Sequence, residues 1–461
     1  MPELKILLGA EKFAELRRSN FYYADKTAFL EKFLSSGKPN VASKVALFTR
    51  PRRFGKTLFM SMLAEFFDIT RDSRELFEGL AVSRNKRLCE EWMNRYPVIS
   101  LNLKGVGGLC FEDAFAKFHN QILKCVSGYY RFYEDPAVTP QDRLYLNAIL
   151  QQKAGKSELA KALCTMSRAL AGYYKRPVIV LIDEYDTPVV NAARGGYYNE
   201  MVDFVRDFFG YTFAANAALK FGVLTGVMPI TKESLFGGLD SLRHYGVSDS
   251  DYADIFGFTQ DEVDTLLDKA GLSSKREEVR AWYGGYSFGG TQEMYCPWNI
   301  LNYVVDHKNN PQLEPKAYWL DTSGNELVQR LVAQTLADPH DIDALLDGGT
   351  LAARLHFFPE CRNLSRDSNL VYPFFHRVSD KCPARREKET EPARLGQRYP
   401  DHSQQGSGKD LHLGVEGMVL AQPAGLSAHK PLPGLPECGC QTLCRASFRQ
   451  SACRYRLARA Q

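Results

Sequence analysis

Apolar residues in the first half of the chain form short continuous runs, which alternate with longer stretches of mixed polarity. The apolar runs have the length of strands and lie at 44–49, 97–103, 177–182 and 219–226. Runs of this kind predict strands buried on both faces, as in a parallel sheet. The mixed stretches predict helices near 112–126, 157–174 and 200–215. Strands that alternate with helices predict an α/β fold, a parallel sheet flanked by helices.

The pattern becomes mostly helical after the last apolar run. Thr259 to Val263 has the form of a capping box at a helix start, with acids in the first turn. Two further stretches, 297–306 and 326–336, also predict helices. Beyond about residue 377 no periodicity is sustained, and Ile and Asn are absent. The chain is therefore expected to have three parts: a core over 1–244, a mostly helical lid or arm over 245–370, and an irregular tail over 371–461.

The composition is that of an ordinary soluble protein. Of 461 residues, 44% are hydrophobic and 24% are charged, and the net charge is +4. This length predicts two or three domains, and so small a charge gives no reason by itself to expect a nucleic-acid partner. No apolar run approaches the ~18 residues of a membrane span, and the N-terminal apolar segment is too short for a secretory signal. We expect a cytoplasmic protein with no membrane partner.

A candidate phosphate-binding loop (P-loop, or Walker A motif) follows the first predicted strand. Residues 55–57 read GKT, and Leu58 begins an apolar pattern that predicts a buried helix. A strand, a loop and then a helix that opens at GKT form the context in which this motif binds phosphate. The N–H groups and the dipole at the helix N-terminus attract the anion. The usual motif is G-x-x-x-x-G-K-[ST], and Arg50 stands where its first glycine would be.

This loop predicts a site for ATP and Mg²⁺. Gly55 lets the backbone approach the phosphates, Lys56 reaches the outer phosphates as a catalytic cation, and the Thr57 hydroxyl ligates Mg²⁺. The residues predicted to bind the nucleotide are Arg50, Pro51, Arg52, Arg53, Phe54, Gly55, Lys56, Thr57 and Leu58.

Two acids end the third apolar run, in the manner of a Walker B motif. Asp183 and Glu184 follow Ile182, and α/β sheets bind ligands at the C-terminal edge of their strands. Asp183 is predicted to hold Mg²⁺, directly or through water. Glu184 is predicted to polarise the attacking water, as phosphoryl transfer requires. Thr225, near the end of the fourth run, is a candidate sensor of the γ-phosphate; the alternative interpretation is a capping threonine in a turn.

Several motifs resemble the AAA-ATPase-like family, whose members are mostly prokaryotic. They are FYYADKT (21–27), RPRRFGKT (50–57), LIDEYD (181–186), LTGV (224–227), KES (232–234), WYGGYSF (282–288), PWNILNY (297–303), YW (318–319) and TSGN (322–325). In this family RPRRFGKT is the usual form of the loop, so the resemblance accommodates Arg50. It implies a P-loop ATPase core, a helical lid, and a C-terminal nuclease-type domain of the PD-(D/E)XK superfamily.

Arg50, Arg52 and Arg53 are predicted to lie beside the triphosphate. Arginine forms bidentate contacts with phosphate, so one of them, with Arg53 as the candidate, would stabilise charge in the transition state. The alternative is that they bind the sheet edge or an acidic neighbour. The sequence departs from many relatives at Pro229, where those relatives have Arg, and at Asp240-Ser241, where an Asn pair is common. Loss of a sensor arginine at 229 would slow hydrolysis.

The tail lacks the pattern of the expected nuclease-type domain. After Tyr372 there is no acid pair followed by a Glu-x-Lys motif on predicted strands. One interpretation is a disordered basic tail that binds nucleic acid. A second is a zinc site, although the spacing of its cysteines does not fit the usual pairs; they are Cys438, Cys440, Cys444 and Cys453. The favoured hypothesis is a reading frame shifted from about 365–378.

The leading hypothesis is an Mg²⁺-dependent P-loop ATPase that works as a homo-oligomer. One alternative is a switch that binds ATP, hydrolyses little and acts through a protein interaction. Another is a protein that binds DNA and uses its ATP site only for loading, against which the weak net charge counts.

Overall fold

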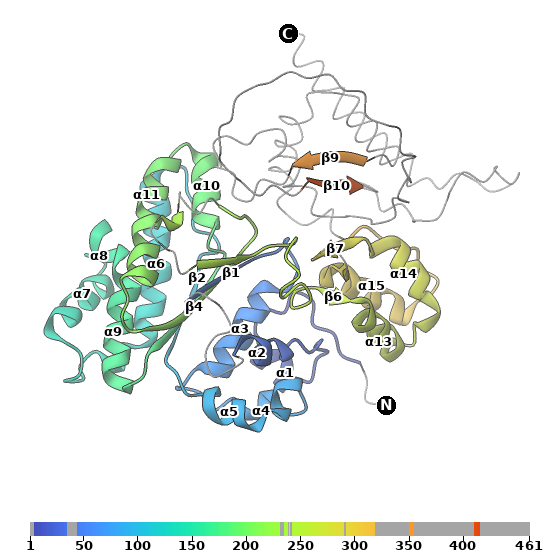
Figure 1. Cartoon of the computed structure of the whole chain (residues 1–461), viewed down its shortest axis with the longest axis horizontal. Helices are drawn as coiled ribbons and strands as arrows, with labels where there is room; N and C mark the ends of the chain where they lie inside the picture. The colour runs from blue at the N-terminus through green and yellow to red at the C-terminus, as the bar shows by residue number, and fades with distance from the viewer. Residues whose placement is uncertain are drawn as a thin grey trace, which may run out of the picture. The chain divides into compact units, whose positions relative to one another are not determined.

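The computed structural model describes residues 4–34, 44–230, 235–237, 239, 242–289, 292–318, 350–354 and 410–414. The helix expected over 326–336, the Asp240-Ser241 pair and the tail cysteines lie outside these residues. The chain divides into two compact units (Figure 1). The first consists of 1–276, 288–321 and 357–364, and the second of 277–287, 322–356 and 365–461.

Five strands form the central sheet of the first unit. They are β1 (Val45–Thr49), β2 (Val98–Asn102), β3 (Val178–Asp183), β4 (Leu219–Gly226) and β5 (Leu242–Tyr245). Their order is β2-β3-β4-β1-β5, and every neighbouring pair runs parallel. Every residue of β1 and β3 is buried, which is why their sequences are continuous apolar runs. The predicted α/β fold with a parallel sheet is confirmed.

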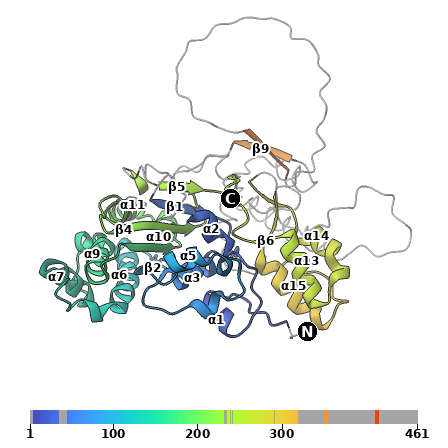
Figure 2. The ribbon, with the colours of Figure 1, turned by 60° about the horizontal axis from the view of Figure 1, so that its bottom comes forward.

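Helices cover both faces of this sheet (Figure 2). α3 (Lys56–Phe67) contacts β2, β3 and β4, whereas α6 (Phe111–Gly128) contacts β2 and α9 (Ala162–Tyr174) contacts β3. The connections β1 to β2 and β2 to β3 cross the sheet in opposite directions. Because parallel crossovers are right-handed, α3 lies on one face and α6 and α9 lie on the other.

The remaining α-helices and strands of the described residues are as follows. The helices are α1 (Phe13–Arg18), α2 (Ala28–Phe33), α4 (Arg74–Phe77), α5 (Lys86–Trp92), α7 (Pro140–Leu150), α8 (Lys156–Ala160), α10 (Thr187–Gly195), α11 (Tyr198–Phe209), α13 (Gln260–Ala270), α14 (Arg276–Tyr283) and α15 (Pro297–Asn309). The strands are β6 (Phe258–Thr259), β7 (Tyr286–Phe288), β8 (Gln292–Tyr295) and the antiparallel pair β9 (Thr350–Arg354) and β10 (Asp410–Gly414). The stretch expected as one helix over 157–174 is divided into α8 and α9 at Lys161.

The predicted capping box starts α13 and also receives the N-terminal segment. The Thr259 hydroxyl accepts a bond from the Glu262 N–H at 3.3 Å, and the Glu262 carboxylate accepts one from the Thr259 N–H at 2.8 Å. Lys26 Nζ lies 2.6 Å from the same Glu262 carboxylate and donates to the Asp254 carbonyl at 2.8 Å. Lys26 and Glu262 are only 13% and 23% exposed, so water screens this pair weakly. The pair ties the N-terminal segment to α13.

Replacing Lys26 with methionine is expected to lower the free energy of unfolding by ~2 kcal/mol, because it leaves a largely buried carboxylate without its cation. Lys104→Met is the control. Lys104 binds Glu11 at 2.7 Å, but the two side chains are 68% and 57% exposed. Surface pairs contribute ~1 kcal/mol or less, so the control should change stability little. Chemical denaturation of the two variants measures the free energy of unfolding that each loses. Equal losses would contradict a larger contribution from the Lys26–Glu262 pair.

Candidate phosphate-binding site

The candidate site lies at the C-terminal edge of the sheet, where β1, β3 and β4 end side by side. Thr49 of β1 is opposite Gly226 of β4, and Thr225 of β4 is opposite Asp183 of β3. The loop that follows β1 returns to the sheet as α3, which begins at Lys56. The sheet therefore brings the loop and the acidic end of β3 together, with β4 between their strands.

The backbone of the loop is shaped to receive an anion. Arg53 has φ +68° and Gly55 has φ +85°, so two left-handed residues flank Phe54. Alternation of this kind turns successive N–H groups toward a common concavity that binds anions. Gly55 is the N-cap residue of α3, whose helix dipole adds positive potential at the same point.

Lys56 lies beneath this loop. Its ammonium donates to the carbonyls of Arg50 at 3.1 Å and Pro51 at 3.0 Å, and the residue is 5% exposed. Burial lowers the pKa of Lys56, while the nearby carboxylates of Glu184, Asp183 and Asp186 act to raise it. The Lys56 ammonium is thus held between the loop and the acids at the end of β3 and in the turn that follows it, residues 183–186, which is called the Glu184 turn below.

Asp183 is held by four donors from four segments. One oxygen accepts the Thr57 hydroxyl at 2.7 Å and the Asn102 amide at 3.0 Å. The other accepts the Thr225 hydroxyl at 2.6 Å and the Glu184 N–H at 3.0 Å. Burial raises the pKa of Asp183, and the bonds from Thr225 and Thr57 oppose that rise. The bond from Thr57 joins the loop to the acidic strand directly.

Asn102 was not predicted as a site residue. It ends β2 and is opposite Asp183 in the sheet register. A polar residue at the end of a mostly apolar strand was the available signal in the sequence, but the residue opposite it depends on strand order. Thr225, the candidate sensor of the γ-phosphate, lies opposite Asp183 in the sheet register. It is fully buried and its hydroxyl is bonded to Asp183, so it contributes by fixing the acid.

Glu184 occupies an unusual backbone conformation. Its φ is +57°, which is uncommon for any residue other than glycine and costs ~1 kcal/mol or more. Its carboxylate accepts a bond from the Thr187 hydroxyl at 3.1 Å, and the side chain is partly exposed. Such strain is retained where the surrounding structure fixes it, often at functional sites.

Residues 7–236 match the family described as "Predicted AAA-ATPase". This part of the chain belongs to that family. The chain is also 30% identical over 324 residues to the "Uncharacterized protein in vnfD 5'region" of Azotobacter chroococcum mcd 1. The match covers 70% of this chain and 55% of that protein, so the chain spans about half the length of this relative. Membership in the family implies nucleotide binding.

The first arginine of the AAA-ATPase-like loop differs from expectation, because its side chain points into the fold. The Arg50 guanidinium donates to the carbonyls of Thr49 at 2.8 Å, Tyr245 at 3.0 Å and Tyr252 at 2.9 Å. It is 1% exposed, and burial lowers its pKa to about 10. Arg50 therefore ties β1 to β5, as in the alternative that placed these arginines at the sheet edge.

The other two arginines of the loop are exposed. The Arg53 guanidinium lies 4.3 Å from the ring centroid of Trp298, in the first turn of α15. Cation–π contacts of this kind contribute ~0.5–1 kcal/mol at exposed sites. Arg52 and Arg53 remain the guanidinium groups of the loop that solvent reaches.

The donor set of the AAA-ATPase-like site fits Mg²⁺ held with phosphate. Mg²⁺ prefers oxygen ligands, and protein sites usually supply one or two of them and leave the rest to phosphate and water. The Thr57 hydroxyl and the Asp183 carboxylate are such a pair. Within the described residues, no cluster of three or more His, Cys, Asp or Glu side chains forms a metal cage.

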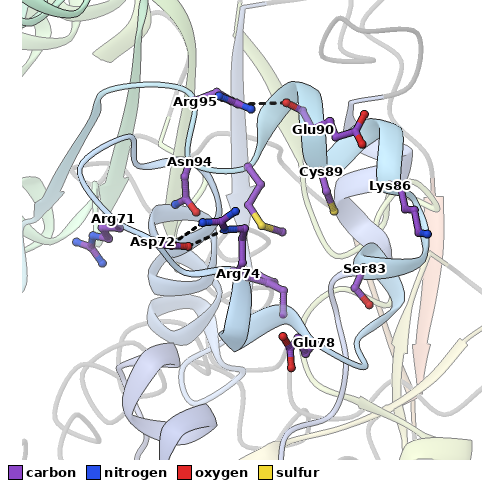
Figure 3. A pocket seen from close by; sticks show the side chains of 12 residues that line it. Arg71, Asp72, Arg74, Glu78, Ser83, Lys86, Cys89, Glu90, Asn94 and Arg95 are labelled. Carbon is purple, nitrogen blue, oxygen red and sulfur yellow. Dashed lines mark hydrogen bonds and ion pairs between the residues drawn. The ribbon is translucent and has the colours of Figure 1, made fainter.

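A separate cavity of about 560 Å³ opens between α4 and α5 (Figure 3). Several of its charged residues bind other groups of the protein. Arg74 donates to both Asp72 oxygens, at 2.8 and 2.6 Å, and Arg95 donates to the Glu90 carbonyl at 3.1 Å. This pairing does not distinguish one class of ligand from another.

In the part of the chain that the structure describes, no helix is long and apolar enough to cross a membrane.

Proposed function

We propose that this chain binds ATP with Mg²⁺ and hydrolyses it. The observation that carries the proposal is the 2.7 Å bond between the Thr57 hydroxyl and the Asp183 carboxylate, with Lys56 beneath the same loop. This arrangement supplies N–H groups and a cation for phosphates and oxygen ligands for Mg²⁺ at one point. Mg²⁺, when bound, would neutralise charge that develops on the transferred phosphoryl group.

The residues of the chain have separate tasks in the proposed reaction. The loop and α3 would orient the phosphates, and Lys56 would stabilise negative charge on them. Thr57 and Asp183 would hold Mg²⁺, with Asn102 and Thr225 fixing the carboxylate of Asp183. Glu184 would accept a proton from the attacking water, and Arg53 is the candidate for stabilising charge from the loop. Assembly as a homo-oligomer belongs to the same proposal.

A second candidate function is a switch that binds ATP and acts through a protein partner with little hydrolysis. Pro229 favours it, because proline offers no positive charge at the position where many relatives carry arginine. The position follows β4 closely, and β4 borders both the loop and the acidic strand.

The test is ATP binding and Mg²⁺-dependent phosphate release by the full chain. Lys56→Ala is expected to weaken ATP affinity by ~10- to 100-fold, because hydrogen bonds to a charged group contribute ~1.5–3 kcal/mol. Lys104→Ala removes an exposed lysine and should leave affinity unchanged. Calorimetry measures binding, and a coupled phosphate assay measures turnover. Binding without turnover would favour the switch, and no binding by the wild type would refute the proposed function.

A further inference from the structure

The turn that carries Glu184 is bound to the segment after β4 by a set of bonds that the ATP site itself does not require. Asp186 Oδ2 accepts the N–H groups of Val227 at 3.1 Å and Met228 at 2.7 Å. The Tyr185 hydroxyl donates to the Met228 carbonyl and accepts the Ile230 N–H at 3.1 Å. The Glu184 turn and residues 227–230 are therefore fixed against each other on the C-terminal side of the sheet.

The second oxygen of Asp186 is an outlier among the buried polar atoms. Asp186 is 3% exposed, and its Oδ1 has no hydrogen-bond partner among the described residues. Oδ1 lies so close to Gly226 that a Cβ added there would be 2.5 Å from it. A buried carboxylate with one unpaired oxygen costs stability, and a neutral side chain of the same size would avoid much of that cost. An acid at position 186 therefore suggests a functional role in addition to packing.

We propose that Asp186 is a positioning residue for ATP hydrolysis, whose carboxylate holds the Val227-Met228 backbone against the Glu184 turn and so keeps Glu184 in its left-handed conformation beside Asp183. This inference rests on the proposed function. Asp186 reaches the reaction only through Glu184. It is connected to that residue through Tyr185, whose N–H donates to the Thr225 carbonyl at 3.1 Å. The strained φ of Glu184 needs such fixed surroundings.

The burial of Asp186 also changes its protonation. Burial, with the Glu184 charge adding to it, raises the pKa of Asp186 to about 7, while the Met228 N–H and Lys56 act in the opposite direction. The folded chain thus holds a proton that the unfolded chain releases above its ordinary pKa of 3.8. The stability contributed by this raised pKa is full below pH 3.8 and is lost as the pH rises to about 7. Removing the charge should therefore stabilise the fold more at pH 8 than at pH 5.

The experiment compares Asp186→Asn and Asp186→Ala in the full chain. Asp186→Asn keeps an oxygen acceptor and removes the buried charge; its melting temperature should rise, more at pH 8 than at pH 5. Its turnover should nevertheless fall ~10-fold, because two charge-assisted bonds become neutral ones. Asp186→Ala should lose ~100-fold in turnover, and ATP affinity should stay within about threefold in both variants, because the phosphate-binding groups are untouched. Asp203→Asn, at an exposed residue of α11, is the control.

The outcomes separate positioning from support of the fold. A residue that only supports the fold would move melting temperature, affinity and turnover in the same direction, and this result overturns the proposal. Turnover by Asp186→Asn within twofold of wild type also overturns it, whether or not the alanine variant folds. The wild-type chain is measured first. If the wild type shows no turnover, the proposed ATPase activity is refuted and this inference with it. If the wild type and Asp186→Asn are equally active, only the inference is refuted.

Discussion

Replacing Glu184 with glutamine is expected to lower ATP turnover by ~10²- to 10⁴-fold, the range that a positioned general base supplies. ATP affinity should stay within about threefold, because the change removes only an interaction made in the transition state. Glutamine has the same shape, and its carbonyl can still accept the Thr187 hydroxyl that glutamate accepts at 3.1 Å. The only property removed is the basic carboxylate.

Single-turnover phosphate release and equilibrium ATP binding measure the two quantities separately. Glu200→Gln is the matched control, since Glu200 is an exposed acid in the first turn of α11. Undiminished turnover in Glu184→Gln would place the base elsewhere. Loss of ATP binding together with turnover would instead assign Glu184 a structural role.

Introducing at position 50 the first glycine of the general P-loop motif is expected to destabilise the protein. Arg50→Gly removes a buried guanidinium that is bonded to three carbonyls, those of Thr49, Tyr245 and Tyr252. It leaves these carbonyls without their donor and opens a cavity beside the rings of Phe256 and Phe288. The expected loss is ~3–5 kcal/mol of unfolding free energy, comparable to breaking a buried charged network.

The control for this prediction is the same substitution three residues later. Arg53 is exposed and has φ +68°, a conformation that glycine adopts without strain. Arg53→Gly loses the Trp298 contact and relieves the backbone, so its net effect should be about 1 kcal/mol or less. Urea denaturation of both variants gives the comparison. Similar midpoints for Arg50→Gly and wild type would show that the three bonds contribute little.

The sequence was informative where burial dictates composition. The four apolar runs became β1, β2, β3 and β4; β1 and β3 are buried at every residue, and strands buried on both faces are almost entirely apolar. β5 was missed: its four residues include Arg243 and His244, and β5 has no apolar run to mark it. It is instead placed by pairing with β1, a contact almost 200 residues away in sequence that no local pattern encodes.

The site was predictable to the extent that its motifs are local. GKT and the Asp-Glu end of β3 identified the loop and the acids, and the resemblance to the AAA-ATPase-like family joined them. The direction of the Arg50 side chain was not predictable, because its carbonyl partners at 245 and 252 depend on the position of β5. The contribution of Asn102 likewise depends on β2 lying next to β3. These features are set by strand order.

The position of β4 between β1 and β3 limits how its sequence can vary. Most of its first six residues are buried apolar positions, but Gly222 is an exception, because a Cβ added there would lie 2.5 Å from the Phe213 ring. Its last two residues meet neighbours on both sides, since Thr225 binds Asp183 and the Gly226 carbonyl accepts the Arg50 N–H at 3.1 Å. Gly226 also has no room for a Cβ beneath Asp186. Related chains should therefore vary least at Gly222, Thr225 and Gly226, and more at the other buried positions of this strand, where another apolar side chain can pack.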